Sequence, residues 1–485
     1  MNTTFFQEPQ LEFGIDCHID IKFGLMNYGP LDFQSATAPK KINLGVIGTP
    51  ESIEGVQKWL EKCRSGIPAK FSKRVNLFPR FPGFGQDMRL CADFVFDSQM
   101  CRVIPERKFQ ELCNYPKTDD ILRTIADLFL AEMEYLAQKN IADVLVCAYP
   151  FRLIEFLEQE EDELLSDDDG DRGQTIQSVP TKMVFHDYLK AMAMRFKKPT
   201  QIIRPSTYDE KKRLRRNYPS GEFRQVQDEA TRAWNLYIAL YYKAGGLPWR
   251  LVRDWSQLST CYIGVSFYKS TDRQKLLTST AQVFNERGEG VILRGGLGQI
   301  KDDRQVHLNN EDAYKLLRNG LENYHREHKN FPARVVIHKS SIHSQEEIDG
   351  FEQALRDCSI ESTQADFISV TRSFTRLYRM GKYPPLRGTF LDTGGQVFVL
   401  YTKGSVDFYN AYPGLYVPLP LGFRCDQTSE TPKFIAQEIL GLTKMNWNNA
   451  QFDGSEPITL RASRQVGNIL KYLDNDYEPY YRFYM

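Results

Sequence analysis

Short apolar runs and amphipathic stretches alternate in the first third of the chain. Residues 41–50 and 142–150 read as buried strands, whereas 51–63 and 119–139 carry apolar residues at helical spacing. Strand, helix and strand in this order predict an α/β domain with a parallel sheet. Before this domain, residues 18–33 alternate like a strand and close on a Gly-Pro pair.

The second half of the chain shows a different order of elements. Early β-hairpins followed by β-α-β units predict a layered sheet like that of ribonuclease H. Strands are expected at 261–270, as a pair around a Gly turn within 281–295, and at 333–341, 365–373, 394–402 and 415–420. Helices are expected at 312–328, 346–358, 434–447 and 462–475.

Length and charge narrow the class of protein. A chain of 485 residues is too long for one small core, which indicates two or more domains. Lys plus Arg and Asp plus Glu both number 62, so the net charge is zero. A net charge of zero argues against a protein that coats nucleic acid with a basic surface, but it does not exclude a local basic channel.

Nine cysteines are scattered without a C-x-x-C pair, so zinc knuckles and thioredoxin-like chemistry are not expected. They read as reduced, mostly buried thiols. The first residues lack a secretory signal pattern, and no apolar run has membrane-spanning length. We therefore expect a cytoplasmic protein without a membrane partner.

Two charged segments interrupt these patterns. The acidic stretch 158–173 is read as a solvated loop, with a docking surface for a basic partner as the alternative. The basic stretch 211–224 is either a solvated loop or a contact to a nucleic-acid backbone.

Four spaced polar residues are the main chemical signal. His186 and Lys190 lie four apart in FHDYLKAMAM and would share one face of a helix. Gln201 follows in KKPTQIIRP, and Lys243 ends an aromatic helical stretch in YYKAGGLPW. Two cations, an amide and an imidazole could converge on a terminal phosphate.

These segments resemble a prokaryotic Argonaute of the short class. The resemblance covers nearly the whole chain and rests on FHDYLKAMAM with PTQII, and further on GLPWRL, YIGVSFYKS, ARVVIHKSS, the stretch from ILGLTKMNW to LRAS, and the aromatic tail. It implies an α/β fold in which a Rossmann-like MID domain is followed by a ribonuclease-H-like PIWI domain. The implied ranges are an N-terminal strand segment packing on PIWI at 1–38, MID at 39–250 and PIWI at 251–485.

The family's anchor for the 5′ end of a guide strand carries over to His186, Lys190, Gln201 and Lys243. Gln201 would reach a phosphate oxygen or a metal-bound group, and His186 would bond the phosphate or stack on the first base. In related proteins the C-terminal carboxylate helps to hold a divalent cation, so Mg²⁺ or a similar ion is expected at Gln201 and Met485.

The acids of a cutting PIWI domain are missing from their expected places. Ser266 stands in YIGVSFYKS, Lys339 and Ser340 follow ARVVIH, and Ser463 lies in RASRQ. Hydroxyl groups without carboxylates cannot hold two metal ions tightly. The sequence therefore predicts a chain that is not an enzyme, with Ser266, Ser340 and Ser463 near the lost catalytic positions.

Other candidate residues are weaker indications of a function. Glu286 and Glu289 are read as solvent-exposed turn residues. His338, Lys339 and His343 are read either as phosphate contacts from a strand-end loop or as ordinary loop residues. The glycine-rich stretch 290–301 lacks the spacing of a nucleotide-hydrolysing phosphate loop.

The resemblance implies recognition without cleavage in a prokaryotic defence system. A 5′-phosphorylated guide RNA would pair with single-stranded invading DNA and activate a separate APAZ-containing effector chain. That effector would be sirtuin-like or a TIR domain and would deplete NAD, while this chain itself binds no NAD. The alternatives are a guide-directed endonuclease with unconventional metal ligands and a structural subunit without a nucleic-acid role.

Overall fold

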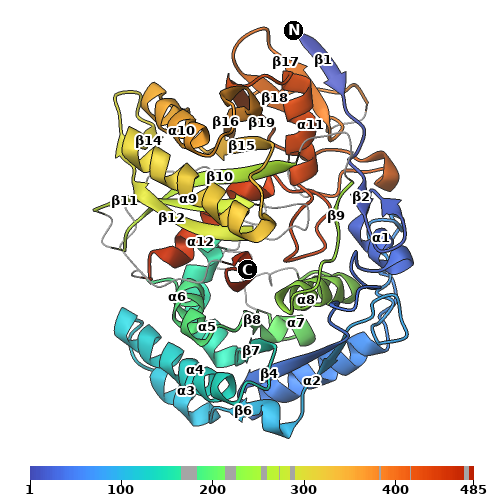
Figure 1. Cartoon of the computed structure of the whole chain (residues 1–485). Coiled ribbons are helices and arrows are strands. Elements are labelled where there is room, and N and C mark those ends of the chain that lie inside the picture. Colours follow the sequence, from blue (N-terminus) through green and yellow to red (C-terminus); the bar gives the residue numbers. More distant parts are fainter. Residues whose placement is uncertain are drawn as a thin grey trace.

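Two lobes, each built on its own β-sheet, lie one above the other (Figure 1). The structure is a computed structural model that describes residues 1–164, 183–213, 226–252, 259–271, 274–283, 290–381, 384–414, 417–473 and 480–485. We call the part around the first sheet the lower lobe and the part around the second sheet the upper lobe.

The lower lobe contains a parallel five-stranded sheet in the order β5-β4-β7-β8, with β6 also paired to β4. Its strands are β4 (Lys41–Gly48), β5 (Asp93–Val95), β6 (Cys101–Val103), β7 (Val144–Ala148) and β8 (Thr200–Ile203). Alternate residues of these strands enter two apolar clusters, as in Val146 and Cys147. Both faces are therefore covered, as in doubly wound folds.

Helices from the intervening segments cover the two faces of this sheet. Residues of α2 and α8 join the cluster that contains Val146, and residues of α3, α4, α5 and α6 join the cluster that contains Cys147. The bounds are α2 (Pro50–Arg64), α3 (Glu106–Leu112), α4 (Asp119–Lys139), α5 (Phe151–Leu164), α6 (Phe185–Ala193), α7 (Pro205–Tyr208) and α8 (Glu229–Lys243).

The upper lobe contains a mixed nine-stranded sheet in the order β1-β17-β18-β19-β16-β15-β10-β11-β12. Only β10, β15 and β16 pair in parallel, and the other neighbours are antiparallel. The bounds are β1 (Asn2–Phe5), β10 (Thr260–Lys269), β11 (Leu276–Val283), β12 (Gly290–Leu297), β15 (Arg334–Lys339), β16 (Ala365–Arg372), β17 (Thr389–Asp392), β18 (Phe398–Leu400) and β19 (Leu421–Gln427).

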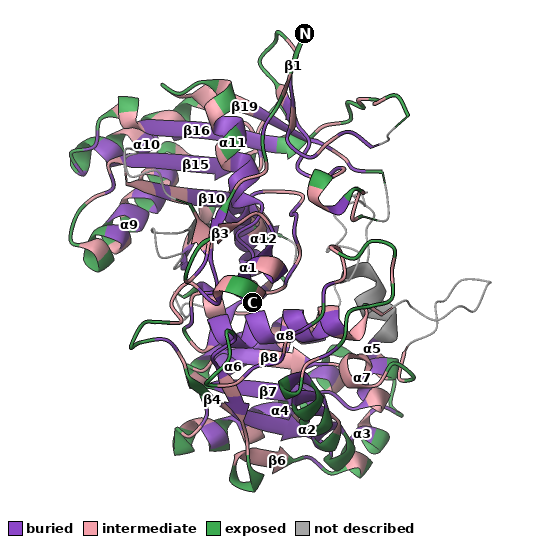
Figure 2. Cartoon of the chain, turned by 90° about the vertical axis from the view of Figure 1, so that its right-hand side faces the viewer, coloured by how far each residue is buried: buried purple, intermediate pink, exposed green. Residues whose placement is uncertain are grey.

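Two helices lie on each face of the nine-stranded sheet, which gives the ribonuclease-H-like layering. Residues of α9 (Asn310–His328) and α10 (Gln345–Asp357) form one apolar cluster with β10, β15 and β16. On the other face lie α11 (Pro432–Leu442) and α12 (Ile458–Leu470). Figure 2 shows the buried strands of both sheets in purple.

Small elements connect the lobes. They are β2 (Leu11–Glu12), β3 (Cys17–His18) and β9 (Arg250–Leu251), which form one sheet, and the helix α1 (Ile21–Tyr28). The hairpin of β13 (Gln299–Ile300) and β14 (Val306–His307) belongs to the upper lobe, where His307 lies 3.1 Å from Glu347 of α10. Near the chain start, Glu8 forms ion pairs with Arg387 (2.9 Å) and Lys444 (3.3 Å), both of which are buried.

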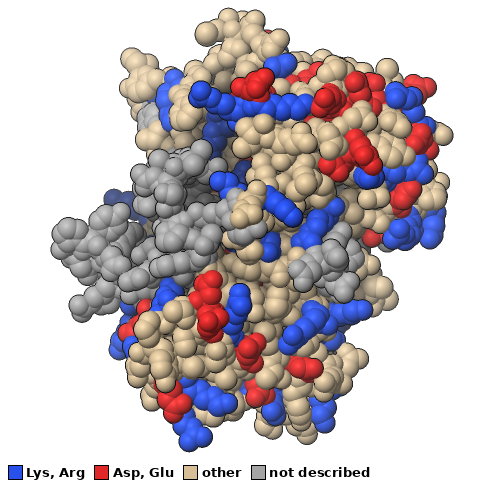
Figure 3. Space-filling view, turned by 90° about the vertical axis from the view of Figure 1, so that its left-hand side faces the viewer, with Lys and Arg blue, Asp and Glu red and all other residues tan. Residues whose placement is uncertain are grey.

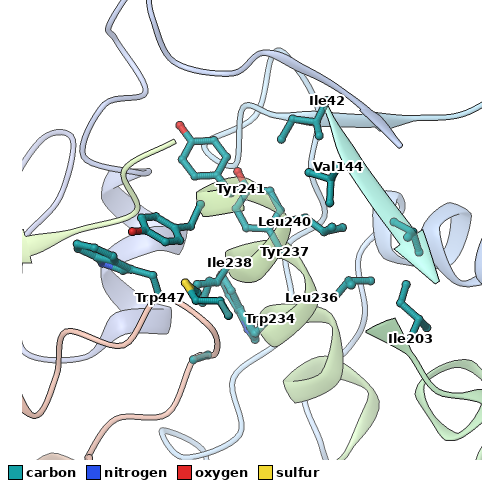
Figure 4. Close-up of a cluster of buried hydrophobic side chains, with 14 of the residues drawn as sticks. Ile42, Val144, Ile203, Trp234, Leu236, Tyr237, Ile238, Leu240, Tyr241 and Trp447 are labelled. Carbon is teal, nitrogen blue, oxygen red and sulfur yellow. The ribbon is translucent and has the colours of Figure 1, made fainter. Parts of the chain in front are cut away.

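The helix α8 is buried almost all round, because it lies between the lower sheet and a loop of the upper lobe. Twelve of its fifteen residues are buried. Figure 4 shows its side chains between Ile42, Val144 and Ile203 on one side and Trp447 on the other. The indole of Trp447 donates to the carbonyl of Trp249 (3.1 Å), which follows α8. A helix that is apolar all round is expected in such an interior position.

One predicted strand proves to be a helix. The alternation within 18–33 predicted a strand, but α1 occupies 21–28. Asp20 caps this helix by accepting from the Phe23 amide (2.8 Å), and Gly29 ends it with a φ of 72°. Ile21 and Leu25 lie four apart and are fully buried, so the helical spacing decides the conformation.

Two further predictions are wrong. The acidic residues 158–164, expected in a loop, continue α5, while 165–182 lie outside the described residues. The strand expected at 415–420 is not formed at 417–420, and β19 begins directly afterwards. Pro418 and Pro420 have no amide hydrogen to give to a ladder, which moves the start of pairing to Leu421.

All nine cysteines are free, and six of them are buried, as expected. Within the described residues, no helix combines the length and apolar character needed to cross a membrane.

Candidate nucleic-acid interface

The helix α6 presents its polar residues to the junction between the lobes. His186 and Lys190 lie one turn apart on it, as the sequence predicted. Val184, just before the helix, donates its amide to the hydroxyl of Tyr472, at the end of the upper lobe's last helix (2.8 Å). The helix is therefore held against the upper lobe at the end that carries His186.

Lys190 is only 6% exposed, and its ammonium group donates to the main-chain oxygen of Met485. Burial lowers the pKa of Lys190 to about 8, against an opposing effect of the Asp187 carboxylate. The lysine is thus held in a dry position where its charge is costly unless an anion compensates it.

Lys243 and Gln201 form the second half of this site. Lys243, only 2% exposed at the end of α8, donates to Gln201 Oε1 (2.6 Å), and Gln201 Nε2 donates to the carbonyl of Ile202 (2.9 Å). Burial, and then the charge of Lys190, hold the pKa of Lys243 well below its ordinary value. No carboxylate side chain contacts Lys243 among the described residues.

His186 takes a less central place. Its Nδ1 lies 3.0 Å from Asp187 Oδ1, and its side chain is 36% exposed. Burial and the charge of Lys190 lower the pKa of His186, whereas Asp187 raises it. No contact joins His186 to Gln201 or Lys243 within the described part of the chain.

The structure therefore pairs Lys190 with Met485 and Lys243 with Gln201, and the charges of the two lysines act on each other. His186 lies one helical turn from Lys190. Asp187 is a member of this site that the sequence interpretation missed. Its position next to His186 in FHDYLK was the available signal, since a carboxylate beside an imidazole sets which ring nitrogen carries the proton.

The oxygen atoms expected to hold a divalent cation are engaged by lysines. Lys243 donates to Gln201 Oε1, and Lys190 donates to Met485 O. Two ammonium groups thus lie at the oxygen atoms to which the sequence interpretation assigned a metal ion. Among the described residues, no group of three His, Cys, Asp or Glu side chains is arranged to hold one.

The three serines expected near lost catalytic positions lie close to the edge of the upper sheet where the neighbouring strands β10 and β15 have their carboxyl ends. Ser266 on β10 and Ser463 on α12 are buried, with their hydroxyl oxygens 2.7 Å apart. Ser340 directly follows β15, and its amide donates to Val265, the neighbour of Ser266 (3.2 Å). Three hydroxyl groups at this edge can donate and accept hydrogen bonds but offer no charge to a metal.

Lys339 at the same edge belongs to a buried charge network. Its ammonium lies 2.7 Å from Glu347, which also accepts from the Leu308 amide (2.8 Å) and lies 3.1 Å from His307 Nδ1. Burial lowers the pKa of Lys339, and the charge of Glu347 opposes that shift.

The phosphate-contact interpretation of His338, Lys339 and His343 is wrong, as is the loop interpretation for the first two. His338 and Lys339 lie within β15 and are buried, with His338 Nδ1 2.9 Å from the Thr459 hydroxyl. His343 is buried against Asp426, at 2.8 Å. Because β15 lies in the interior of the sheet, the side chains of His338 and Lys339 point into the protein.

Three other candidates remain largely outside the described residues. Glu286 and Glu289 lie in 284–289, which is not described, and most of the basic stretch 211–224 lies in 214–225. Of its described residues, Lys212 pairs with Glu51 at the surface.

The distribution of surface charge agrees with an interface between the lobes. On the face shown in Figure 3, Lys and Arg side chains from both lobes border the band where the lobes meet. Asp and Glu side chains are most numerous on the outer part of the upper lobe, and several also lie on the lower lobe. A basic band of this kind is suited to a polyanion.

The fold is shared with solved Argonaute and Piwi structures at low sequence identity. No protein-family model and no curated protein matches the chain. The solved structure of Clostridium butyricum Argonaute, bound to a guide DNA and a 19-mer target DNA, matches 97% of the chain with a TM-score of 0.64 at 15% identity. Drosophila Piwi matches 99% (TM-score 0.59, 11% identity).

Marinitoga piezophila Argonaute, in complex with a 5′-hydroxyl guide RNA, matches the whole chain with a TM-score of 0.56 at 13% identity. The chain spans 53%, 56% and 59% of the lengths of these three proteins. The chain therefore has the MID–PIWI fold of Argonaute proteins, with a ribonuclease-H-like sheet in its upper lobe.

Proposed function

We propose that this chain is a guide-directed nucleic-acid recognition subunit that holds the 5′-phosphate of a short guide strand at Lys190, Gln201 and Lys243. The observation that carries the proposal is a pair of buried lysines, Lys190 and Lys243, of which the second donates to Gln201, in a MID–PIWI fold. A dianionic phosphate would compensate both charges and accept from the amide of Gln201. His186 would contact the phosphate or the first base.

A binding experiment tests this anchor. We expect the double variant Lys190→Ala, Gln201→Ala to lose most of its affinity for a 5′-phosphorylated oligonucleotide, since each charged contact contributes about 1.5–3 kcal/mol. Its affinity for the 5′-hydroxyl oligonucleotide should change little. Lys108→Ala on α3, an exposed lysine, is the matched control. Equal loss for both oligonucleotides would contradict a phosphate anchor.

The two lysines also suggest how the site treats metal ions. Since ammonium groups already engage Gln201 Oε1 and Met485 O, we expect a chelator to leave affinity for the phosphorylated strand within about twofold, below 0.5 kcal/mol. Loss of binding on chelation, restored by Mg²⁺, would show that a cation displaces the lysines.

We further propose that the chain recognises its target without cutting it. Ser266, Ser340 and Ser463 supply hydroxyl groups at the sheet edge, and Lys339 is neutralised by Glu347. A labelled complementary strand should stay intact with the purified, guide-loaded chain in Mg²⁺ and in Mn²⁺. Cleavage above background would favour the rival function, a guide-directed endonuclease with unconventional metal ligands.

The remaining parts of the proposal rest on the resemblance to short prokaryotic Argonautes. The guide would be RNA, the target single-stranded invading DNA, and the place of action the cytoplasm. A separate APAZ-containing effector, sirtuin-like or TIR, would consume NAD on target binding and stop growth of the invaded cell. Target binding would activate it by the difference in free energy between two arrangements.

Sequencing the nucleic acid that co-purifies with the chain and its partner separates this function from that of a purely structural subunit. Short 5′-phosphorylated RNAs are expected. NAD depletion on addition of complementary DNA, and not of unrelated DNA, is the expected response of the assembled complex.

A further inference from the structure

The segment 67–81, between α2 and β5, forms a closed loop on the surface of the lower lobe. Ile67 and Phe81 exchange both backbone hydrogen bonds at 2.9 Å, so the two ends of the segment meet. Compact loops whose ends lie together are Ω-loops, which are frequently functional.

The inner side of this loop is fixed to the rest of the molecule. Lys22 Nζ donates to the carbonyl of Leu77 (2.8 Å), and Asn76 Nδ2 donates to the carbonyl of Phe408 in the upper lobe (2.9 Å). These bonds hold the last third of the loop against both α1 and the upper lobe, and they leave the tip at 68–75 outside.

The loop lies in a purely basic part of the sequence. Between Glu61 and Asp87 there is no acidic residue, and the six basic ones are Lys62, Arg64, Lys70, Lys73, Arg74 and Arg80. Lys62 and Arg64 pair with acids of neighbouring elements. The side chains of Lys73, Arg74 and Arg80 are exposed and have no acceptor among the described residues.

An aromatic side chain stands in the middle of this charge. Phe71 is the most exposed large apolar side chain among the described residues, and Val75 is exposed on the same tip. Lys70 covers the ring of Phe78 instead (4.7 Å), so it does not shield Phe71. Exposed aromatic rings between cations are the means by which proteins hold single strands without reading sequence.

The loop lies on the helix that ends at the proposed anchor. Trp234 of α8 donates its indole proton to the carbonyl of Arg80 (3.2 Å), and Lys243 follows nine residues later. At 1.5 Å per residue the separation along α8 is about 14 Å. A strand whose end is held at Lys243 needs only a few nucleotides to cover that distance.

We propose that the loop 67–81 is a second, sequence-independent contact for a nucleic-acid strand, in which Lys73, Arg74 and Arg80 bind phosphates and Phe71 stacks on a base. It rests on the proposed function, because the strand it contacts is the one whose 5′ end the lysines hold, or the strand paired with it. The absence of any acid between Glu61 and Asp87 favours a polyanion over a protein surface.

The test measures binding of a 5′-phosphorylated single-stranded RNA and a single-stranded DNA over a series of salt concentrations. Lys73→Gln with Arg74→Gln should weaken binding and reduce the slope of log affinity against log salt by about 1.4, the value for two lost phosphate contacts. Phe71→Ser should weaken binding about tenfold without changing that slope. Arg107→Gln with Lys108→Gln, an adjacent exposed pair on α3, is the charge-matched control and should bind as the unmodified protein does.

Unchanged affinity and slope in the loop variants would overturn the inference, as would an equal loss in the α3 control. A loop that binds a protein would give this same unchanged result. Failure of the proposed 5′-phosphate anchor would give a different result, because Lys190→Ala would then leave the preference for 5′-phosphate over 5′-hydroxyl intact. The loop variants should preserve that preference in every case, since they do not touch the end of the strand.

Discussion

At the scale of single residues, the proposed anchor depends on two lysines whose charged form is disfavoured by burial. Burial lowers the pKa of Lys190 to about 8 and that of Lys243 well below its ordinary value. For a lysine with a lowered pKa, the penalty for burying the charge is present below that pKa and disappears as pH rises toward the unfolded value. Stability of the free protein therefore increases between about pH 8 and about pH 10.4.

Binding of a phosphate should follow the opposite trend. Because the neutral amine of Lys190 does not attract a dianion, the preference for a 5′-phosphorylated over a 5′-hydroxyl strand should fall about tenfold from about pH 7 to about pH 9.5. Titrating both oligonucleotides at each pH measures this ratio and removes general effects of pH on the protein. A ratio that stays constant over this range would contradict binding by a lysine of lowered pKa.

The buried pair of Lys339 and Glu347 gives a second prediction. Lys339→Met should lower the free energy of unfolding by about 3–5 kcal/mol, because it leaves the Glu347 carboxylate buried without its cation. Denaturant unfolding measures the change. Lys315→Met, which breaks the exposed pair with Glu311, should leave the stability nearly unchanged, and a loss comparable to that of Lys339→Met would refute the argument from burial.

The sequence indicated the positions of Lys190, Gln201 and Lys243 in the proposed anchor, but it did not show how they pair or that His186 lies apart from Gln201 and Lys243. The spacing of His186 and Lys190 places both on one helical face, whereas contacts such as Lys190 with Met485 join residues 295 apart. The inward turn of His338 and His343 was likewise hidden, because a polar residue next to an apolar run is buried only if its partner comes from elsewhere. For His343 that partner is Asp426, on β19.

At the scale of elements, the close contact between β10 and α12 brings the serines of the two elements together. The carbonyl of Thr459 lies only 2.1 Å from where a Cβ on Gly264 would be, so only glycine allows the helix to approach this strand. The same contact brings Ser463 of α12 to within 2.7 Å of Ser266.

A methyl group at Gly264 should therefore push α12 off the sheet. Gly264→Ala is expected to lower the free energy of unfolding by about 1–3 kcal/mol, the usual cost of overpacking. Gly320→Ala on α9 is the matched control, since its nearest neighbours would lie at 3.5 and 3.6 Å. Gly320→Ala should raise the free energy of unfolding by about 0.5–1 kcal/mol, because alanine has the higher helix propensity. Thermal or urea unfolding of both variants measures the two changes.

Long elements with a clear period were the most predictable. The helix expected at 119–139 has these bounds in α4, where apolar residues recur at helical spacing over five turns. The helix α1 was missed because eight residues give few repeats, and Ile-Asp-Ile-Lys fits a period of two as well. The cap at Asp20 and the four-residue spacing of Ile21 and Leu25 separate the two readings, and each is a single short signal.

At the scale of the whole molecule, the chain start is tied into the upper lobe by charge. Glu8 compensates Arg387 and Lys444 in a buried position, and burial lowers the pKa of Lys444 to about 8 despite that partner. Glu8→Gln should cost about 3–5 kcal/mol, because two buried cations lose their common acid. Glu12→Gln, which affects only a partly exposed pair with Arg250, should cost below about 1 kcal/mol, and equal losses in melting experiments would exclude a special role for Glu8.

The pairing of β1 with β17 has a consequence for the order of events during synthesis. Phe5 lies opposite Thr389, so the first strand has no partner until 384 further residues have left the ribosome. At 5–20 residues per second this wait lasts about 20–80 s. The lower lobe draws all its strands from 41–203 and can form its sheet in that time, while the unpaired edge at the chain start remains open to the wrong neighbours. Newly made chains should accordingly depend on chaperones more than their finished structure suggests.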